Sequence, residues 1–159
     1  MSSLLRKVLL AGSLLLLTQI ALGGAFSKAA AKAPVAKIGG KNIVKLEVAS
    51  TEAAITKGLM FRTSLPEDSG MVFLFNPPRA VNFWMYHTLI PLDMLFVKDG
   101  KIVKLFEQVP PCKSEDPHGC PDYPNGPGIN VSEVIEVNGG YAKRHGVKEG
   151  DTVVFDLNN

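Results

Sequence analysis

The sequence lacks most of the motifs by which an enzyme is identified. It contains no Gly-x-Ser-x-Gly nucleophile elbow, no His-Glu-x-x-His helix, no phosphate-binding loop and no dinucleotide fingerprint. It has two cysteines, one tryptophan, no internal repeat and no long block of like charge. These absences argue against the reaction classes that have a recognisable local signature, and any site must be sought in less specific residues.

Excess charge is also absent outside the N-terminus. The chain has 17 Lys and Arg against 15 Asp and Glu, but Arg6, Lys7 and Lys28 lie in the first 31 residues, which carry no acid. The remainder has 14 bases and 15 acids, a net charge of −1. With no basic stripe, we expect no nucleic-acid partner. We expect an unknown protein or small molecule as partner, and no cofactor.

The N-terminus holds the one long apolar run. Residues 8–20 are apolar or small, follow Arg6 and Lys7, and lead into small residues. This order predicts a secretory signal peptide over residues 1–31, because a membrane-spanning helix needs about 20 apolar residues. An uncleaved signal anchor is the alternative, and it would be the only membrane contact. We therefore expect an extracytoplasmic protein, located in a periplasm, in a lumen or outside the cell.

The two cysteines lie close together in "PCKSEDPHGCPDYPNGPG". In an exported protein, such a pair favours a disulfide between Cys112 and Cys120. The alternative is a metal site that adds Asp116 and His118 as ligands. The spacing is not that of a familiar zinc knuckle, so we predict the disulfide and no metal.

Hydrophobic patterns predict one small β domain. Residues 32–41 resemble a linker, and residues 42–159 form the domain. Val44, Leu46 and Val48 alternate with charged residues, as in a half-buried strand, and Asp99-Gly100 is typical of a hairpin turn. Short helices are expected after Thr51 and before Gly146. The fold class is mainly β, an antiparallel sandwich or partly closed barrel of six or seven short strands with two short helices.

Three ordered motifs carry a family resemblance: "KGLMFRTSLPEDSGMVFLF", "FWMYHTLIPLDMLFVKDGKIV" and "VIEVNGGYAKRHGVKEGD". Across about residues 42–157, the chain resembles the family called domain of unknown function 192, small and often exported prokaryotic proteins. The resemblance implies a compact, mainly β domain and brings no established activity. Tyr86 and His87 stand where Lys and Asn are usual in this family, so no role of that pair is transferred.

Asp93 is the most unusual residue of the apolar stretch "NFWMYHTLIPLDMLFV". An inward carboxylate without a partner would cost several kcal/mol. We expect Arg62 or Arg79 to neutralise it, or turn amides to bind it. In a cleft, it would instead be a general acid or base.

Few other residues are catalytic candidates. His87, expected in a strand with Met85 and Leu89 on its face, is a weak one, and Glu136 is another if it forms a carboxylate pair with Asp93. The expected ligand-binding residues are Arg62, Trp84, Met85 and Asp93.

Two functional hypotheses follow. The first is an extracytoplasmic binding or assembly module with a polar groove near Trp84, Arg62 and Asp93. The second is a hydrolase that uses Asp93 as general acid or base, assisted by Arg62 or His87. A structural or assembly factor without a ligand is a third possibility.

Overall fold

The computed structural model describes residues 32–157. The elements in chain order are β1 (Val35–Ile38), β2 (Asn42–Ala49), α1 (Glu52–Lys57), β3 (Ser69–Arg79), β4 (Asn82–Phe83), β5 (Leu92–Lys98), β6 (Lys101–Val109), the 3-10 turn η1 (Pro117–Gly119), β7 (Tyr123–Pro124), β8 (Val131–Asn138), α2 (Tyr141–His145) and β9 (Val153–Asp156). The predicted signal peptide, residues 1–31, lies outside the described residues.

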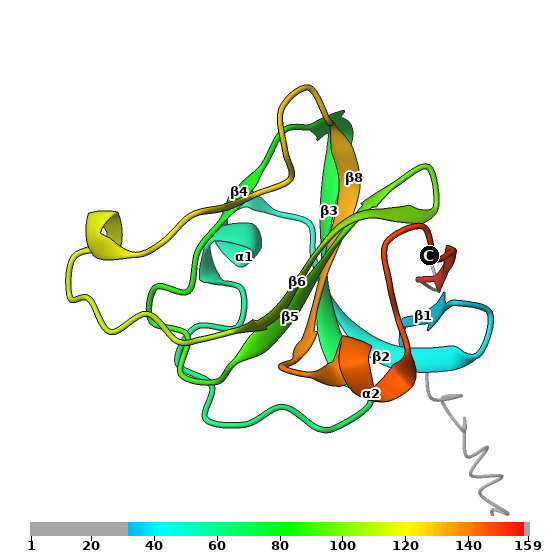
Figure 1. Ribbon diagram of the computed structural model, residues 1–159, viewed down its shortest axis with the longest axis horizontal. Coiled ribbons are helices and arrows are strands. Elements are labelled where there is room, and N and C mark those ends of the chain that lie inside the picture. The colour runs from blue at the N-terminus through cyan, green and yellow to red at the C-terminus, as the bar shows by residue number, and fades with distance from the viewer. Residues whose placement is uncertain (1–31, 158–159) are drawn as a thin grey trace, which may run out of the picture. The chain divides into compact units, whose positions relative to one another are not determined.

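Seven strands form one curled sheet in the order β6-β5-β8-β3-β2-β1-β9 (Figure 1). Its two edge strands approach each other at the β5–β6 turn, where Lys101 bridges Thr152 and the Val153 N–H donates to the Gly100 carbonyl at 2.8 Å. The sheet is therefore a partly closed barrel, which confirms the predicted mainly β class. A second sheet pairs β4 with β7.

One strand pair departs from the expected antiparallel arrangement. β2 and β3 are parallel, with Val48 opposite Val72. Parallel neighbours need a crossover of a dozen or more residues, and residues 50–68 provide it, including α1. The sequence therefore contains one β-α-β unit, which strand and turn patterns alone did not reveal.

The local signals at the predicted helices and the hairpin are confirmed. The Thr51 hydroxyl accepts from the Ala54 N–H at 3.2 Å and begins α1, while Gly58 ends it. Gly146 ends α2 at φ 66°, in the left-handed region that favours glycine. Asp99 and Gly100 both have positive φ between β5 and β6, as the turn type requires.

The predicted linker and the predicted strand around His87 are wrong, and β3 continues past two prolines. Residues 32–41 do not form a linker, because β1 within them pairs with both β2 and β9. The prolines at 77 and 78 do not end β3; they cause a register irregularity, after which Arg79 pairs with Val131. Residues 80–88 are not one strand, because only β4 is extended there before the chain turns.

Each face of the curled sheet has its own apolar core. The inner core contains Val72, Leu95, Val97, Ile135 and Val137, and α2 packs against it. The outer core contains the residues that alternate with these along the same strands. They are Met71, Phe73, Met94, Phe96 and Val134. α1 and α2 accordingly lie on opposite sides of the sheet (Figure 1).

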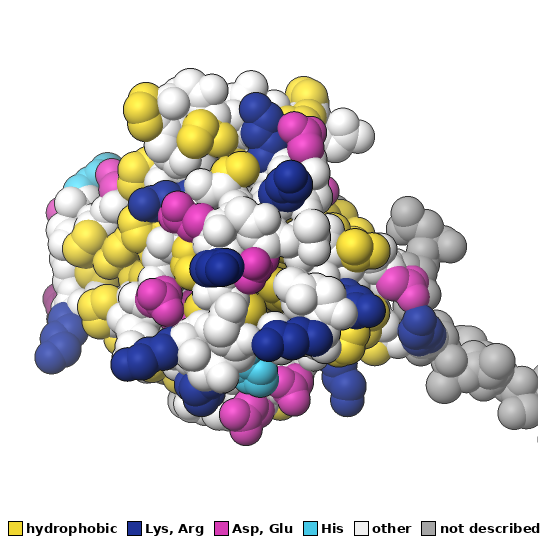
Figure 2. Space-filling view, turned by 45° about the vertical axis from the view of Figure 1, so that its right-hand side comes forward, with side chains coloured by type: hydrophobic (Ala, Val, Ile, Leu, Met, Phe, Trp, Pro, Cys, Tyr) yellow, Lys and Arg dark blue, Asp and Glu magenta, His cyan; other side chains and the backbone are white. Residues whose placement is uncertain are grey.

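Charged side chains of both signs are interspersed on the face shown in Figure 2. The described residues include exposed ion pairs, such as Lys104 with Glu149 and Arg144 with Glu67, both at 3.7 Å. Pairs of this kind contribute little to stability because water screens them.

Candidate ligand pocket

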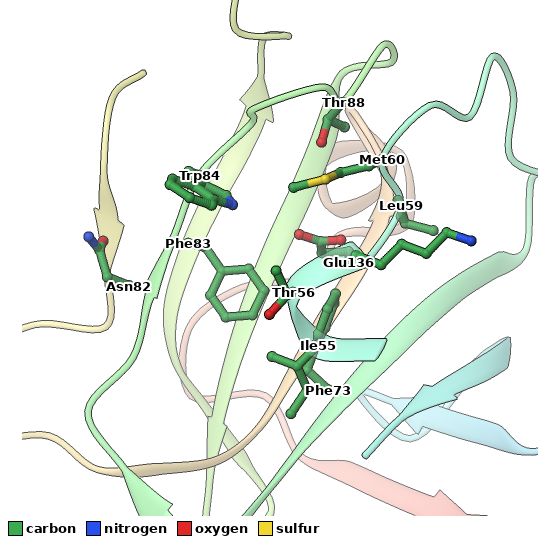
Figure 3. Close-up of a pocket in the computed structure, with 12 residues that line it drawn as sticks. Ile55, Thr56, Leu59, Met60, Phe73, Asn82, Phe83, Trp84, Thr88 and Glu136 are labelled. Carbon is green, nitrogen blue, oxygen red and sulfur yellow. The ribbon is translucent and has the colours of Figure 1, made fainter. Parts of the chain in front are cut away.

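A pocket with a cavity volume of about 200 Å³ opens on the outer face of the sheet. Its walls are α1 with the residues that follow it and the segment 82–88, and its base is formed by β3 and β8 (Figure 3). The lining residues are Ile55, Thr56, Lys57, Gly58, Leu59, Met60, Phe73, Asn82, Phe83, Trp84, Thr88 and Glu136. Six of these residues are apolar, five are polar or charged and one is glycine, and polar groups among apolar ones can fix the orientation of a small molecule.

The end of α1 shapes one wall. Gly58 has φ 43°, and a Cβ at this position would lie 3.2 Å from the Phe73 ring. The helix can therefore end directly over β3, and the chain then delivers Leu59 and Met60 to the pocket. Leu59 is buried and anchors this wall in the outer core.

Glu136 lies at the base of the pocket. It occupies the middle of β8, opposite Met71 of β3 and Met94 of β5, and is only 5% exposed. In Figure 3 its carboxyl group points into the space between Thr56 and Met60. Within residues 32–157, no hydrogen-bond donor or cation contacts this carboxyl group.

Burial changes the acidity of Glu136. Loss of water raises the pKa of its carboxyl group from 4.5 to about 8, and no nearby charge opposes the shift. The side chain is therefore mainly protonated at neutral pH. A carboxyl group with a raised pKa in a pocket is a typical mark of a functional site.

Aromatic rings build the other wall. The Phe83 ring packs edge-on against Phe73 at 4.9 Å and Phe96 at 5.6 Å between centroids, which fixes it in the outer core. Trp84, 39% exposed, forms the rim. Its ring begins a row that continues through Tyr86 at 5.8 Å.

A tight turn positions that row. His87 has φ 53°, and its carbonyl accepts from the Phe61 N–H at 2.8 Å, while the Thr88 N–H donates to the Met85 carbonyl at 3.1 Å. The His87 ring lies 3.9 Å from Tyr86 and 4.7 Å from Phe61 between centroids. The exposed histidine thus belongs to the aromatic row outside the pocket lining.

The loop between β6 and β8 supports this wall from behind. Cys112 and Cys120 form the predicted disulfide, with an S–S distance of 2.08 Å. The Cys112 N–H donates to the Met85 carbonyl at 3.3 Å, and the Tyr86 hydroxyl donates to the Glu115 carbonyl at 3.2 Å. The bridged loop is therefore attached to the segment that carries Trp84.

The Asn125 side chain makes a second attachment. Its Oδ1 accepts from the Val81 N–H at 3.0 Å, and its amide donates to the Ile129 carbonyl.

The rival metal site has no structural counterpart, because Asp116 instead accepts from the His118 N–H at 2.9 Å. Residues 32–157 contain no group of three His, Cys, Asp or Glu side chains placed to hold a metal ion.

Asp93 is buried, but not with an arginine. Its side chain is 0% exposed on the inner face, and its Oδ1 accepts from the Gln108 N–H at 2.7 Å and the Gly140 N–H at 2.8 Å. Its Oδ2 accepts from the Ala142 N–H at 2.7 Å. The expectation of a neutralising guanidinium is wrong, and the alternative of backbone amides is right.

The other predicted ligand-binding residues are scattered. Arg62 forms a two-pronged ion pair with Glu47, at 2.5 and 2.7 Å, and Arg79 contacts Glu52 at 3.3 Å. Met85 is fully buried in the outer core. Of the expected set, Trp84 alone lines the pocket. The expected groove of Trp84, Arg62 and Asp93 is therefore not formed.

Strand alternation also separates Asp93 from Glu136. In the β5–β8 register, Asp93 is opposite Val137 and Glu136 is opposite Met94, so the two carboxyl groups leave the sheet on opposite faces. A glycosidase-like pair requires two carboxyl groups that flank one substrate. These two residues cannot form it.

Sequence reasoning missed the contribution of α1. Thr56, Leu59 and Met60 reach the pocket because the parallel crossover lays α1 over the outer face. The one available signal was Glu136 itself, an acid between the apolar residues Ile135 and Val137.

Comparisons with known proteins agree with this fold. The family model described as DUF192, Uncharacterized ACR, matches residues 34–155. A crystal structure of a protein of unknown function from Novosphingobium aromaticivorans is 36% identical, with 77% of this chain and 83% of that chain covered and a TM-score of 0.66.

A crystal structure from Sinorhizobium meliloti is also similar. It is 33% identical, with 77% of this chain and 94% of that chain covered and a TM-score of 0.65, and that protein is described as a candidate transcription regulator. No curated protein matches the chain.

Proposed function

Because this chain belongs to the DUF192 family, which is uncharacterised, we propose from its geometry that it is an extracytoplasmic module that binds a small, mainly apolar ligand in the pocket at Glu136. The observation that carries the proposal is a carboxyl group on a residue only 5% exposed, without a protein partner, at the base of a pocket lined by apolar and polar side chains. This carboxyl group faces the space of the pocket and has no protein partner, so a ligand that enters the pocket can supply one.

The rigidity of the walls supports the proposal. Phe83 is held by edge-on ring contacts, and the Trp84 segment is attached to a disulfide-bridged loop. A site that is already formed before binding loses less free energy to the ordering of side chains. Trp84 at the rim adds an exposed, amphipathic ring of the kind common in binding sites.

An extracytoplasmic location is the compartment that best fits these residues. The disulfide is expected to persist in an oxidising compartment, and the N-terminal sequence has the pattern of an export signal. No helix within residues 32–157 is long and apolar enough to cross a membrane.

A hydrolase is the second candidate, and Glu136 rather than Asp93 would be its acid. Both Asp93 oxygens are occupied by backbone amides and the side chain has no exposed surface, so it has no access to a substrate. Glu136 has a pKa of about 8 in a pocket, as a general acid requires. The pocket lining contains no second carboxyl group or histidine, and this favours binding over turnover.

Amide NMR spectra of the full chain, recorded with a library of small aromatic and aliphatic compounds, test the binding function. Ligands are expected to shift the amide signals of residues 55–60 and 82–88. Thr56→Phe should fill the mouth of the pocket and weaken binding at least tenfold. Thr63→Phe, an equal change at an exposed position outside the lining, should leave binding intact.

Two results would refute this function. One is a library in which no compound shifts the pocket amides. The other is binding that Thr56→Phe and Thr63→Phe weaken equally. For the hydrolase, turnover of an ester, amide or glycoside that disappears in Glu136→Gln would establish the second candidate instead.

A further inference from the structure

We propose that the ligand is an organic ammonium ion, with its ammonium group beside the Glu136 carboxyl group and its organic part against Trp84 and Phe83. This inference names the ligand class of the site and rests on the binding function proposed above. It follows from the charges, rings and size of the pocket.

The charges of the lining favour a cation. Glu136 is the only acid among the lining residues, and Lys57, an exposed residue of α1, is the only base. The other polar side chains, Thr56, Asn82 and Thr88, are neutral. An anionic ligand would find no buried cation here, whereas an ammonium ion would find a buried carboxyl group that lacks a partner.

The aromatic rings of the pocket wall also favour a cationic ligand. The faces of aromatic rings carry partial negative charge and attract cations, with tryptophan the strongest. Trp84 and Phe83 follow each other along one wall, and Figure 3 shows their rings on the side of the pocket that faces Glu136. A neutral ligand would gain apolar contact from these rings but not the electrostatic attraction.

The cavity limits the size of the ligand. Its volume is about 200 Å³, and an apolar cavity of about 150 Å³ holds a benzene molecule. One ring or a short alkyl chain with a terminal ammonium group therefore fits, and larger amines would extend past Trp84 into solvent.

Binding of an ammonium ion should release a proton. Burial raises the pKa of Glu136 to about 8, so at neutral pH the free site holds a carboxylic acid. The cation stabilises the carboxylate, and the proton passes to solvent while the ammonium group keeps its own. No bond other than the O–H bond of Glu136 breaks.

Few other groups can contribute to this pH dependence. The neighbours of Glu136 across the sheet, Met71 and Met94, do not titrate. Lys57 is the ionisable group that α1 presents to the pocket. On the segment 82–88, Tyr86 and His87 titrate but are not lining residues.

Three probes of one shape test the inference: 2-phenylethylammonium, 2-phenylethanol and phenylacetate. Trp84 is the only tryptophan, so its fluorescence reports binding at the rim, and calorimetry in two buffers counts protons. The full chain should bind the ammonium probe at least tenfold more tightly than the other two. From pH 7 to pH 9, its affinity should rise about tenfold as Glu136 ionises.

The variant Glu136→Gln should lose the preference for the ammonium probe and its pH dependence, while still binding phenylethanol. Glu133→Gln, a matched change on the same strand outside the lining, should behave like the wild type. If Glu136→Gln fails to fold, the proton count of the wild-type protein decides, with close to one proton released per ammonium bound at pH 7.

The outcomes separate the ligand class from the binding function. If phenylethanol or phenylacetate binds as tightly as the ammonium probe, or if no proton is released, the ammonium inference is wrong and a ligand pocket remains. If none of the probes binds, the ammonium inference is also wrong. Only a compound library that leaves the pocket amides unshifted would refute the binding function itself.

Discussion

Asp93 and Glu136 lie on neighbouring strands, one position out of register, and their side chains leave the sheet on opposite faces. The inner face gives Asp93 three backbone N–H donors, one near the end of β6 and two at the start of α2. The outer face gives Glu136 no donor among the described residues, and its pKa rises to about 8.

This difference separates a structural carboxylate from a candidate binding group. Both side chains are almost fully buried, so burial alone does not distinguish them. The distinction lies in the hydrogen bonds, because a carboxylate that accepts several N–H bonds is satisfied by the protein itself, whereas one without donors is not.

The largest expected effect comes from Asp93→Ala. It leaves the N–H groups of Gln108, Gly140 and Ala142 without their acceptor in a buried region. We expect the free energy of unfolding to fall by about 3–5 kcal/mol, measured by urea denaturation. Asp122→Ala, at an exposed loop position, is the control. A loss below 1 kcal/mol would show that these amides do not depend on Asp93.

Glu136→Gln should instead raise the free energy of unfolding. The folded protein keeps a proton that the unfolded chain releases between pH 4.5 and about 8, so wild-type stability falls as the pH rises through this range. The slope approaches about 1.4 kcal/mol per pH unit. Glutamine, which cannot ionise, should therefore raise stability by up to about 3 kcal/mol at pH 7 and have little effect at pH 4.

Denaturation curves of Glu136→Gln and Glu133→Gln across this pH range provide the measurement. The difference between Glu136→Gln and the wild type isolates the titration of this one group. If that difference is the same at pH 4 and pH 8, the carboxyl group is not held in its neutral form, and the contrast with Asp93 is lost.

The double change Cys112→Ser with Cys120→Ser removes the disulfide from the loop that supports the pocket wall on the outer face. We expect a loss of about 2–3 kcal/mol, mainly because the unfolded chain gains freedom. Since the bridged loop contacts the Trp84 segment, the fluorescence of Trp84 should change as well. Free-thiol labelling of protein isolated from its native compartment checks the premise, and two reactive thiols would contradict it.

The smallest effect is expected from Arg62→Ala. Its ion pair with Glu47 is largely exposed, so its removal should cost at most about 1 kcal/mol, and less in high salt. Urea denaturation at low and high salt provides the measurement. A loss as large as that of Asp93→Ala would revive the idea that this guanidinium serves the buried aspartate.

Much of the fold could be predicted because its signals are local. The alternation of Val44 and Leu46, the glycine at position 100 and the cap at Thr51 each specify their own segment. The parallel pairing of β2 with β3 depends on contacts between distant residues, which no local pattern encodes. The turn at His87 is similar, since a non-glycine residue with positive φ gives no warning in the sequence.

The site was harder to predict for a related reason. A period of two shows that Asp93 and its neighbours Leu92 and Met94 point to opposite faces, but not which face is lined by donors. That depends on Gln108, Gly140 and Ala142, which arrive from elsewhere in the chain. The sequence therefore suggested that Asp93 could be a buried structural carboxylate held by turn amides, but it did not identify the amides that hold it.

If residues 1–31 are the predicted export signal, the position of β1 limits where the chain can be cut. This strand pairs with β2 on one side and β9 on the other, and the Pro34 carbonyl accepts from the Leu46 N–H at 2.8 Å. A signal peptidase that cut upstream of Pro34 would leave the barrel whole. A cut only five residues further along would remove β1, the strand that joins β9 to β2, so processing of the predicted signal would have a sharp downstream limit.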